Sequence, residues 1–194
     1  MSGAGRALKR AADVAVSAAA LAAGWPVLAA IAVAIRLESA GPAIFRQERA
    51  GRGMKPFTMY KFRTMRADAG ALGTSPTSPD DPRLTRVGRR LRETSLDELP
   101  QLWNILRGDM SLVGPRPLYM RHAEKFTERE RRRLEVRPGL TGLAQVAGRG
   151  EVPHGEKLEL DVEYVERQSV ALDLEILWRS FARLFVRKDV YQKW

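Results

Sequence analysis

A long apolar run stands near the start of the chain. Residues 14–35 carry no charged side chain, and ten of these 22 residues are alanine. As a helix, this run is about 33 Å long at 1.5 Å per residue, which is enough to cross a hydrocarbon core of about 30 Å. The pattern predicts a membrane helix over residues 12–37, with the core helix of a soluble protein as the alternative. The run is too long for the apolar part of a cleaved signal peptide.

Basic residues flank this run on both sides. Arg6, Lys9 and Arg10 precede it, and residues 36–66 hold eight basic side chains. Basic flanks prefer the cytoplasmic side of a membrane, so a straight span would force one flank outward. Pro26, near the middle, removes one backbone hydrogen bond and bends a helix. These observations favour a re-entrant helix, broken at Pro26, that dips into one leaflet and returns.

Alternating residues after the apolar run predict two strands. Residues 43–49 and 56–65 read as a hairpin around a turn with two glycines. Lys61 and Arg63 share one face of the second strand. Neighbouring cations repel each other unless an anion lies between them, so the pair indicates either an anion site or a solvated edge strand. The Pro- and Gly-rich residues 67–82 predict a loop.

Helical periodicity recurs over the rest of the chain. The last helix has an apolar stripe and basic residues largely elsewhere, which suits a membrane surface. Packing of the stripe onto the protein core is the alternative. The overall expectation is an α+β fold, mostly helical, in a single catalytic domain over residues 1–194: a membrane helix, a short β-hairpin and a helical core with amphipathic interfacial helices. The expected helices are 84–93, 97–108, 121–136, 156–168 and 173–188, with a Gly-rich loop over 137–150.

The composition limits which residue types could carry out a reaction. The 194 residues include 33 Lys and Arg against 23 Asp and Glu, a net charge of +10, so the chain should meet an anionic partner: nucleic acid, anionic lipid or a phosphorylated substrate. There is no cysteine and there are only two histidines, which excludes a thiol nucleophile, Cys-ligated zinc and multi-His metal sites. Any reaction must therefore use carboxylates, hydroxyls and cations.

Two adjacent carboxylates stand out in this setting. Pro100 is tolerated only in the first turn of a helix, so the helix should start near Asp97, with Asp97 and Glu98 at its N-terminus. One interpretation is structural, because Ser95 and Glu98 have capping-box spacing and Asp97 could be the N-cap. The other is chemical, because a carboxylate such as Asp97 can attack phosphorus to give an acyl phosphate. Glu98 could then hold Mg²⁺ together with substrate phosphates.

Arginines surround this pair in the sequence. Arg92 precedes it, and Arg116 follows in the tetrapeptide 114–117, where two prolines impose extended backbone on the residues before them. Arg116 is thus displayed from a stiff segment, which suits a bidentate phosphate contact. Arg149 lies between two glycines, where a ligand can approach the backbone closely. The alternatives are a surface turn at Arg116 and a flexible loop at Arg149.

The chain resembles the small monotopic phosphoglycosyl transferases of the bacterial sugar transferase family, the polyprenyl-phosphate glycosyl-1-phosphate transferases, over nearly all of its length. In that family the re-entrant helix usually breaks at a Ser-Pro pair, whereas this chain has Trp25-Pro26. The bend is still expected, but a hydroxyl that could satisfy freed backbone groups is missing. The matching segments are Lys9-Arg10 with Asp13, FRQERAG, KFRTM (61–65), residues 81–117, RPGLTGLAQVAGRG, Asp161 with Tyr164, and Asp173-Leu174.

The resemblance implies a reaction. Such enzymes move a sugar 1-phosphate from a UDP-sugar to polyprenyl (undecaprenyl) phosphate and release UMP, as the first membrane step of a bacterial glycoconjugate pathway such as exopolysaccharide synthesis. Asp97 would be the nucleophile and Glu98 the Mg²⁺ ligand. The resemblance implies a monotopic protein of the bacterial inner membrane, with residues 38–194 on the cytoplasmic face. The residues that would bind substrate are Arg92, Arg116, Arg149, Lys61, Arg63 and Gln101.

Other interpretations differ in class. A nucleic-acid binder leaves the apolar run without a role, and the chain has no nucleic-acid-binding motif, so no nucleic acid is expected. A catalytically silent, membrane-anchored scaffold that binds anions is the alternative, and the intact Asp97–Glu98 pair argues against it. Because the chain begins just before the expected re-entrant helix, we expect a short family member with the catalytic domain alone, with an excised catalytic domain of a longer member as the alternative. A homodimer is compatible with these features but has no sequence signal.

Overall fold

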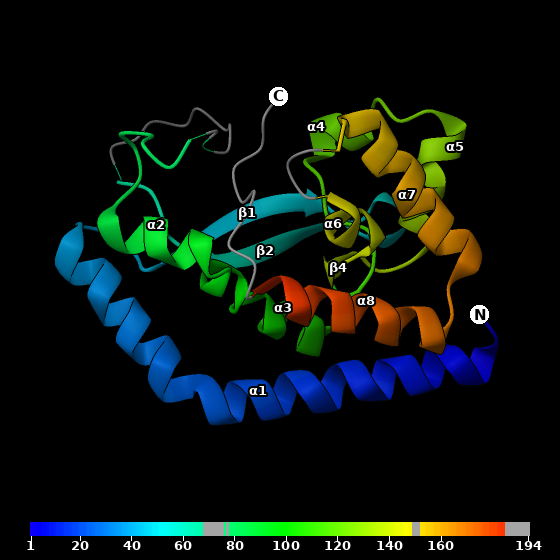
Figure 1. The fold of residues 1–194 in the computed structure, drawn as a ribbon, viewed down its shortest axis with the longest axis horizontal. Helices are drawn as coiled ribbons and strands as arrows, with labels where there is room; N and C mark the ends of the chain where they lie inside the picture. The colour runs from blue at the N-terminus through cyan, green and yellow to red at the C-terminus, as the bar shows by residue number, and fades with distance from the viewer. Residues whose placement is uncertain (68–75, 77, 149–151, 185–194) are drawn as a thin grey trace.

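The computed structural model describes residues 1–67, 76, 78–148 and 152–184, and it is mostly helical, as expected (Figure 1). Its strands form two small sheets rather than one. Three short 3₁₀ helices complete the described part: η1 (Arg52–Met54), η2 (Leu96–Glu98) and η3 (Arg132–Glu135). The longer elements are α1 (Gly3–Glu38), β1 (Ile44–Ala50), β2 (Pro56–Phe62), α2 (Arg86–Glu93), α3 (Gln101–Arg107), β3 (Ser111–Val113), α4 (Met120–Ala123), α5 (Glu128–Arg131), β4 (Gly139–Thr141), α6 (Leu143–Gly148), α7 (His154–Arg167) and α8 (Val170–Leu184).

Helix α1 is the long apolar helix. It is continuous over 36 residues with Pro26 inside it, and Figure 1 shows that it runs along one side of the molecule and changes direction part-way. Only three of its side chains are buried: Asp13, Ser17 and Ile35. Trp25 is 65% exposed. The alternative of a buried core helix is therefore wrong, because most apolar residues of α1 are exposed. In the part of the chain that the structure describes, α1 alone is long and apolar enough to cross a membrane.

The N-terminal end of α1 is fixed to the rest of the molecule by charged side chains. Lys9 Nζ donates to the Val113 carbonyl at 2.9 Å and to Asp173 Oδ2 at 2.8 Å. The backbone N–H of Leu112 donates to Asp13 Oδ1 at 3.0 Å. Arg10 also donates to two carbonyls at the end of α3. These bonds explain why charges stand immediately before the apolar run.

The C-terminal end of α1 is fixed to the same body. The guanidinium of Arg63 donates to the Ser39 carbonyl at 2.7 Å and to the Ala40 carbonyl. The carboxylate of Glu38 accepts from the backbone N–H groups of Arg86 and Val87 at 2.7 and 2.8 Å. It thereby satisfies two of the free donors at the start of α2. Both ends of α1 are tied down, and its apolar middle is exposed.

The hairpin expected from the alternating pattern is present. Strands β1 and β2 pair antiparallel, from Ile44 opposite Phe62 to Ala50 opposite Pro56. Asn104 joins α3 to this hairpin: its Nδ2 donates to the Thr58 carbonyl at 2.7 Å, and the Tyr60 N–H donates to its Oδ1 at 3.1 Å. The residues just before α3 are thereby held close to β2.

The main core lies between α3, β3, α7 and α8. On α8, Leu172 and Ile176 are buried, whereas other apolar residues of the same helix are exposed. The stripe expected on the last helix is therefore only partly used for packing, and Leu174, Trp178 and Phe181 remain exposed. Residues 185–188 of the expected helix lie outside the described residues. The buried members of this core are Met59, Leu102, Ile105, Met110, Leu112, Val113, Val146, Tyr164, Leu172 and Ile176.

Two sequence predictions were wrong about elements. The single helix expected over 121–136 is divided into α4, α5 and η3, because Thr127 starts a new helix through a capping box with Glu130. The Gly-rich stretch 137–150 is largely ordered: it forms β4, parallel to β3, and then α6. Gly139 allows close packing there, since a Cβ on it would lie 2.1 Å from the backbone nitrogen of Gly114. The loop expected over 67–82 lies mostly outside the described residues.

Candidate active site

The two adjacent carboxylates lie on a turn between α2 and α3. Helix α2 ends at Glu93, and Ser95 adopts a left-handed conformation with φ of 57° that turns the chain into η2. The α-helix begins only at Gln101, so the expected helix start near Asp97 is a 3₁₀ turn instead. The Ser95 side chain makes no capping hydrogen bond, so the capping-box interpretation is wrong. A left-handed non-glycine residue costs energy and often marks a functional site.

Glu98 is held by two cations. Its Oε1 accepts from Lys61 Nζ and from Arg116 Nη2, both at 2.8 Å. Lys61 comes from β2, and Arg116 comes from the segment after β3. Burial alone would raise the pKa of Glu98, but the charges of Arg116 and Lys61 outweigh it and hold that pKa far below the usual range. Glu98 is therefore ionised at neutral pH and fixed in position.

Asp97 differs from its neighbour. Its side chain is buried, with 7% of the residue exposed, and its carboxylate accepts no hydrogen bond from the residues described. Burial raises the pKa of Asp97 to about 6, and the charge of Glu98 adds to this effect. Asp97 is thus ionised at neutral pH but poorly solvated and without a hydrogen-bond partner in the described chain, which suits a nucleophile.

Two further sequence-predicted residues lie near this turn. Arg92 Nε donates to Thr64 Oγ1 at 2.9 Å, and the charge of Arg92 lowers the pKa of Asp97. Gln101, the first residue of α3, is buried, and its Nε2 has no hydrogen-bond partner among the described residues. An unpartnered buried donor next to the carboxylates is a candidate for contact with a ligand.

The structure does not bring every predicted residue together. Arg63 lies beyond the end of β2 and binds the carbonyls that follow α1, so it is not part of the cluster around Glu98. Arg149 lies outside the described residues. Trp25 and Pro26 belong to the exposed middle of α1, away from its two tied ends.

Arg49 is a site residue that the sequence interpretation missed. Its guanidinium carbon lies 3.7 Å from the centre of the Tyr119 ring, and its Nη1 donates to the Pro117 carbonyl at 3.4 Å. Burial lowers the pKa of Arg49 to about 10, and the charges of Arg116 and Glu98 also act on it. The only sequence signal was its position inside the FRQERAG segment.

The side chains of the candidate site can be compared with the ligands that Mg²⁺ needs. The residues that the structure describes contain no group of three or more His, Cys, Asp or Glu side chains that could enclose a metal ion. Mg²⁺ at phosphate-handling sites commonly needs only one or two carboxylates, because substrate phosphates and water complete its coordination. Glu98, which stays ionised, fits that second mode, with substrate phosphates as further ligands.

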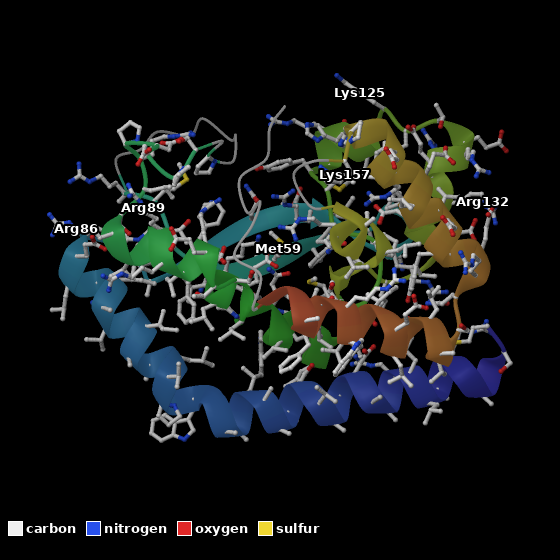
Figure 2. All side chains as sticks on the ribbon, in the orientation of Figure 1. Met59, Arg86, Arg89, Lys125, Arg132 and Lys157 are labelled. Carbon is white, nitrogen blue, oxygen red and sulfur yellow. The ribbon has the colours of Figure 1, made fainter. Side chains whose placement is uncertain are left out.

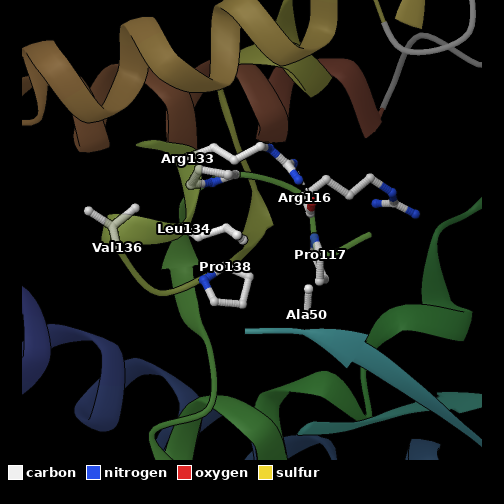
Figure 3. A pocket seen from close by; sticks show the side chains of 8 residues that line it. Ala50, Arg116, Pro117, Arg133, Leu134, Val136 and Pro138 are labelled. Carbon is white, nitrogen blue, oxygen red and sulfur yellow. Dashed lines mark hydrogen bonds between the residues drawn. The ribbon is translucent and has the colours of Figure 1, made fainter. Parts of the chain in front are cut away.

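A small cavity lies behind the backbone of Arg116. Its volume is about 10 Å³, room for about one water molecule, so it is not a substrate pocket. Figure 3 shows that the Arg116 side chain points away from this cavity. In Figure 2, Lys125 and Lys157 lie on the side of the molecule away from α1.

Comparison with known proteins identifies the family. A sequence profile of the bacterial sugar transferases matches residues 4–187. The chain belongs to the bacterial sugar transferase family. The match covers most of the described structure, from α1 through the Asp97–Glu98 turn to α8.

Several members of the bacterial sugar transferase family are close in sequence. The sugar transferase EpsL of Bacillus subtilis is 48% identical over 166 residues, which are 86% of this chain and 81% of EpsL. Two proteins named UDP-glucose:undecaprenyl-phosphate glucose-1-phosphate transferase also match. The one from Caulobacter vibrioides is 44% identical over 94% of this chain and 72% of its own length. The one from Escherichia coli is 43% identical over 98% of this chain, which spans only 43% of that relative's length.

Proposed function

We propose that the protein transfers a sugar 1-phosphate from a UDP-sugar to polyprenyl phosphate, with release of UMP, through a covalent phosphosugar on Asp97. The observation that carries the proposal is the pair of unlike carboxylates: Asp97 is buried and has no described hydrogen-bond partner, whereas Glu98 is locked between Lys61 and Arg116. The names of the relatives support the two substrate classes.

In the first step, a carboxylate oxygen of Asp97 attacks the phosphorus that carries the sugar. The bond from this phosphorus to the bridging oxygen breaks, and UMP leaves with that electron pair. The pKa of Asp97, about 6, means that the attack needs no general base at neutral pH. The charges of Arg116, Lys61 and Arg92 would offset the repulsion between the carboxylate and the diphosphate.

In the second step, an oxygen of the polyprenyl phosphate attacks the same phosphorus. The bond between Asp97 and phosphorus breaks, which gives the polyprenyl diphosphate sugar and restores the free carboxylate. The acceptor phosphate is already anionic, so this step needs no base either. A site with many cations and no histidine nearby is sufficient for both steps.

Glu98 would hold Mg²⁺ together with the donor diphosphate. When bound, Mg²⁺ supplies positive charge that neutralises the phosphates and stabilises the leaving group. Glu98 is suited to this role because it stays ionised and because Lys61 and Arg116 fix its orientation.

The membrane arrangement that we propose is monotopic. The exposed middle of α1 and the exposed apolar residues of α8 support contact with a bilayer. Lys9 and Arg63 tie the two ends of α1 to the same body. A helix tied at both ends cannot leave its N-terminus across the membrane from that body. This supports a re-entrant helix, bent at Pro26, on the cytoplasmic face of the bacterial inner membrane.

The test is UMP release by the purified protein in nanodiscs with Mg²⁺, undecaprenyl phosphate and a panel of UDP-sugars. We expect Asp97→Asn to lower the rate by at least ~1,000-fold and Glu98→Gln by ~100-fold. Asp80→Asn is the matched control, because its carboxylate is 84% exposed, and it should match wild type. Absence of UMP from every sugar, with folded and membrane-bound protein, would favour the silent scaffold. Full activity of Asp97→Asn would refute the nucleophile.

A further inference from the structure

The segment that carries Arg116 belongs to no helix or strand. Its shape is instead imposed by hydrogen bonds from neighbouring elements to its backbone. These bonds are Gly114 N–H to the Thr141 carbonyl, Gly139 N–H to the Pro115 carbonyl and Ala50 N–H to the Leu118 carbonyl, each at 2.9 Å. The direction of the Arg116 side chain therefore depends on what holds the backbone of Arg116 itself.

One buried arginine holds that backbone. Arg133 Nη2 donates to the Arg116 carbonyl at 2.6 Å. The same guanidinium donates to Asp161 Oδ2, from Nη2 at 2.5 Å and from Nε at 3.1 Å. Figure 3 shows Arg133 reaching the Arg116 backbone, while the Arg116 side chain extends away from the cavity. A continuous chain of contacts thus runs from Asp161 through Arg133 and Arg116 to Glu98.

We propose that Arg133, itself oriented by Asp161, is a positioning residue that aims the guanidinium of Arg116 at the catalytic carboxylates. This inference rests on the proposed function, because it assigns Arg116 a role in phosphate binding beside Asp97. Arg133 does not touch the substrate, and it acts only through Arg116.

The energetics of the Arg133–Asp161 pair favour such a role over a purely structural one. The side chains are 2% and 3% exposed, and Asp161 Oδ1 has no hydrogen-bond partner among the described residues. Removing two charges from water is costly, and apolar residues of similar volume often stabilise a fold as well or better. An apolar pair cannot donate a hydrogen bond to the Arg116 carbonyl, whereas the planar fork of arginine can bind a carboxylate and a carbonyl together.

The first test replaces the ion pair without emptying the space it fills. In the double variant Arg133→Met/Asp161→Leu, we expect an unfolding temperature near that of wild type. We also expect kcat/KM for the UDP-sugar to fall at least tenfold. A misplacement of ~1 Å can cost ~100-fold, which sets the scale of the loss. Wild-type kcat/KM in this folded variant would overturn the proposal.

The second test asks whether the effect passes through Arg116. In an Arg116→Ala background, the Arg133→Met/Asp161→Leu pair should cause no further loss, because residues that act through one another are not additive. Additive losses would overturn the proposal. Arg137→Met is the matched control: it removes an arginine bond to the Gly108 carbonyl and should leave kcat/KM unchanged.

Two further measurements distinguish a loss of the positioning role from misfolding and from failure of the proposed function. Arg133→Lys keeps the positive charge beside Asp161 but loses the planar guanidinium. We therefore expect a folded protein with an intermediate loss of kcat/KM. This variant keeps the proposal testable even if the double variant fails to fold. Affinity for UDP, measured by calorimetry, needs no turnover and should fall several-fold in both variants. A wild-type protein that releases no UMP would count against the proposed function, whereas unchanged UDP affinity in the variants would count against the positioning role.

Discussion

Asp97 and Glu98 are neighbours in the chain, yet their surroundings give them opposite properties. Lys61 and Arg116 bind Glu98 directly and keep it ionised, whereas burial raises the pKa of Asp97 to about 6. Two carboxylates with separated pKa values are typical of sites in which each carboxylate has its own role. This arrangement lowers the free energy of unfolding, because an ionised, poorly solvated Asp97 destabilises the folded protein at neutral pH.

The destabilisation by Asp97 predicts that Asp97→Asn is more stable than wild type. The folded pKa of Asp97 lies above the value of about 3.9 expected in the unfolded chain. Proton binding therefore favours the folded state fully below pH ~4, and this stabilisation is lost as pH rises through about 6. At pH 7.5 we expect Asp97→Asn to raise the free energy of unfolding by roughly 1–3 kcal/mol.

The effect should be almost lost near pH 4, where Asp97 is protonated in the folded state and about half protonated in the unfolded chain. Denaturant unfolding of wild type, Asp97→Asn and the exposed control Asp80→Asn at the two pH values measures it. An Asp97→Asn variant that is less stable than wild type at pH 7.5 would contradict the assignment of a strained carboxylate.

The two carboxylates of the candidate site were easier to select from the sequence than the residues that hold them. Asp97, Glu98 and Arg116 could be selected from the resemblance and from the prolines around Arg116. Strand alternation put Lys61 and Arg63 on one face, but Arg63 lies past the end of β2 and turns to the carbonyls after α1. Arg133 was not predicted, because residues 121–136 were expected to form a single helix and gave no sign of a buried pair.

At the scale of elements, one close contact positions α2 and the turn after it that carries Asp97 and Glu98. Gly88 packs on the backbone of Thr64, where a Cβ would lie 2.0 Å from the carbonyl oxygen. Thr64 also accepts the hydrogen bond from Arg92. The hairpin, α2 and α7 were predicted because their periodicity is regular. The short elements α4, α5 and β4 were not predicted, because they are too short to show a periodic pattern and are fixed by tertiary contacts.

This contact predicts a sharp contrast between two glycines. Gly88→Ala should lower the free energy of unfolding by ~1–3 kcal/mol, since the backbone atoms of Thr64 cannot move aside easily. It should also reduce UMP release, because α2 leads into the Asp97 turn. Gly155→Ala on α7 meets no atom within 4 Å and should be neutral or stabilising by up to ~1 kcal/mol. Equal effects at the two positions, measured by denaturant unfolding, would contradict the packing described.

At the scale of the whole molecule, the apolar helix α1 and the body that carries Asp97 and Glu98 form one unit. Lys9 and Arg10 tie the start of α1, and Glu38 and Arg63 tie its end. Glu38 caps α2, and α2 leads to the turn that carries Asp97. On the proposed function, this arrangement would hold the site at a fixed height above the bilayer, where a lipid-borne phosphate would meet a soluble nucleotide sugar.

The proposed monotopic arrangement predicts the side of the membrane on which the N-terminus lies. The chain has no cysteine, so single-cysteine variants need no background changes. Gly3→Cys, at the start of α1 with open space around it, and Glu124→Cys, exposed on the catalytic body, should both react with an impermeant maleimide in inverted membrane vesicles. Neither should react in intact spheroplasts. Labelling of Gly3→Cys from outside would establish a spanning helix.

The most direct measurement is a search for the phosphosugar on Asp97 itself. The protein is incubated with a UDP-sugar that it accepts and Mg²⁺, without polyprenyl phosphate, and the peptide that contains Asp97 is analysed by mass spectrometry. We predict a mass gain on Asp97 equal to one sugar 1-phosphate less one water, absent in Asp97→Asn and lost when polyprenyl phosphate is added. Release of UMP with no adduct on Asp97, or an adduct that persists after the acceptor is added, would contradict the account.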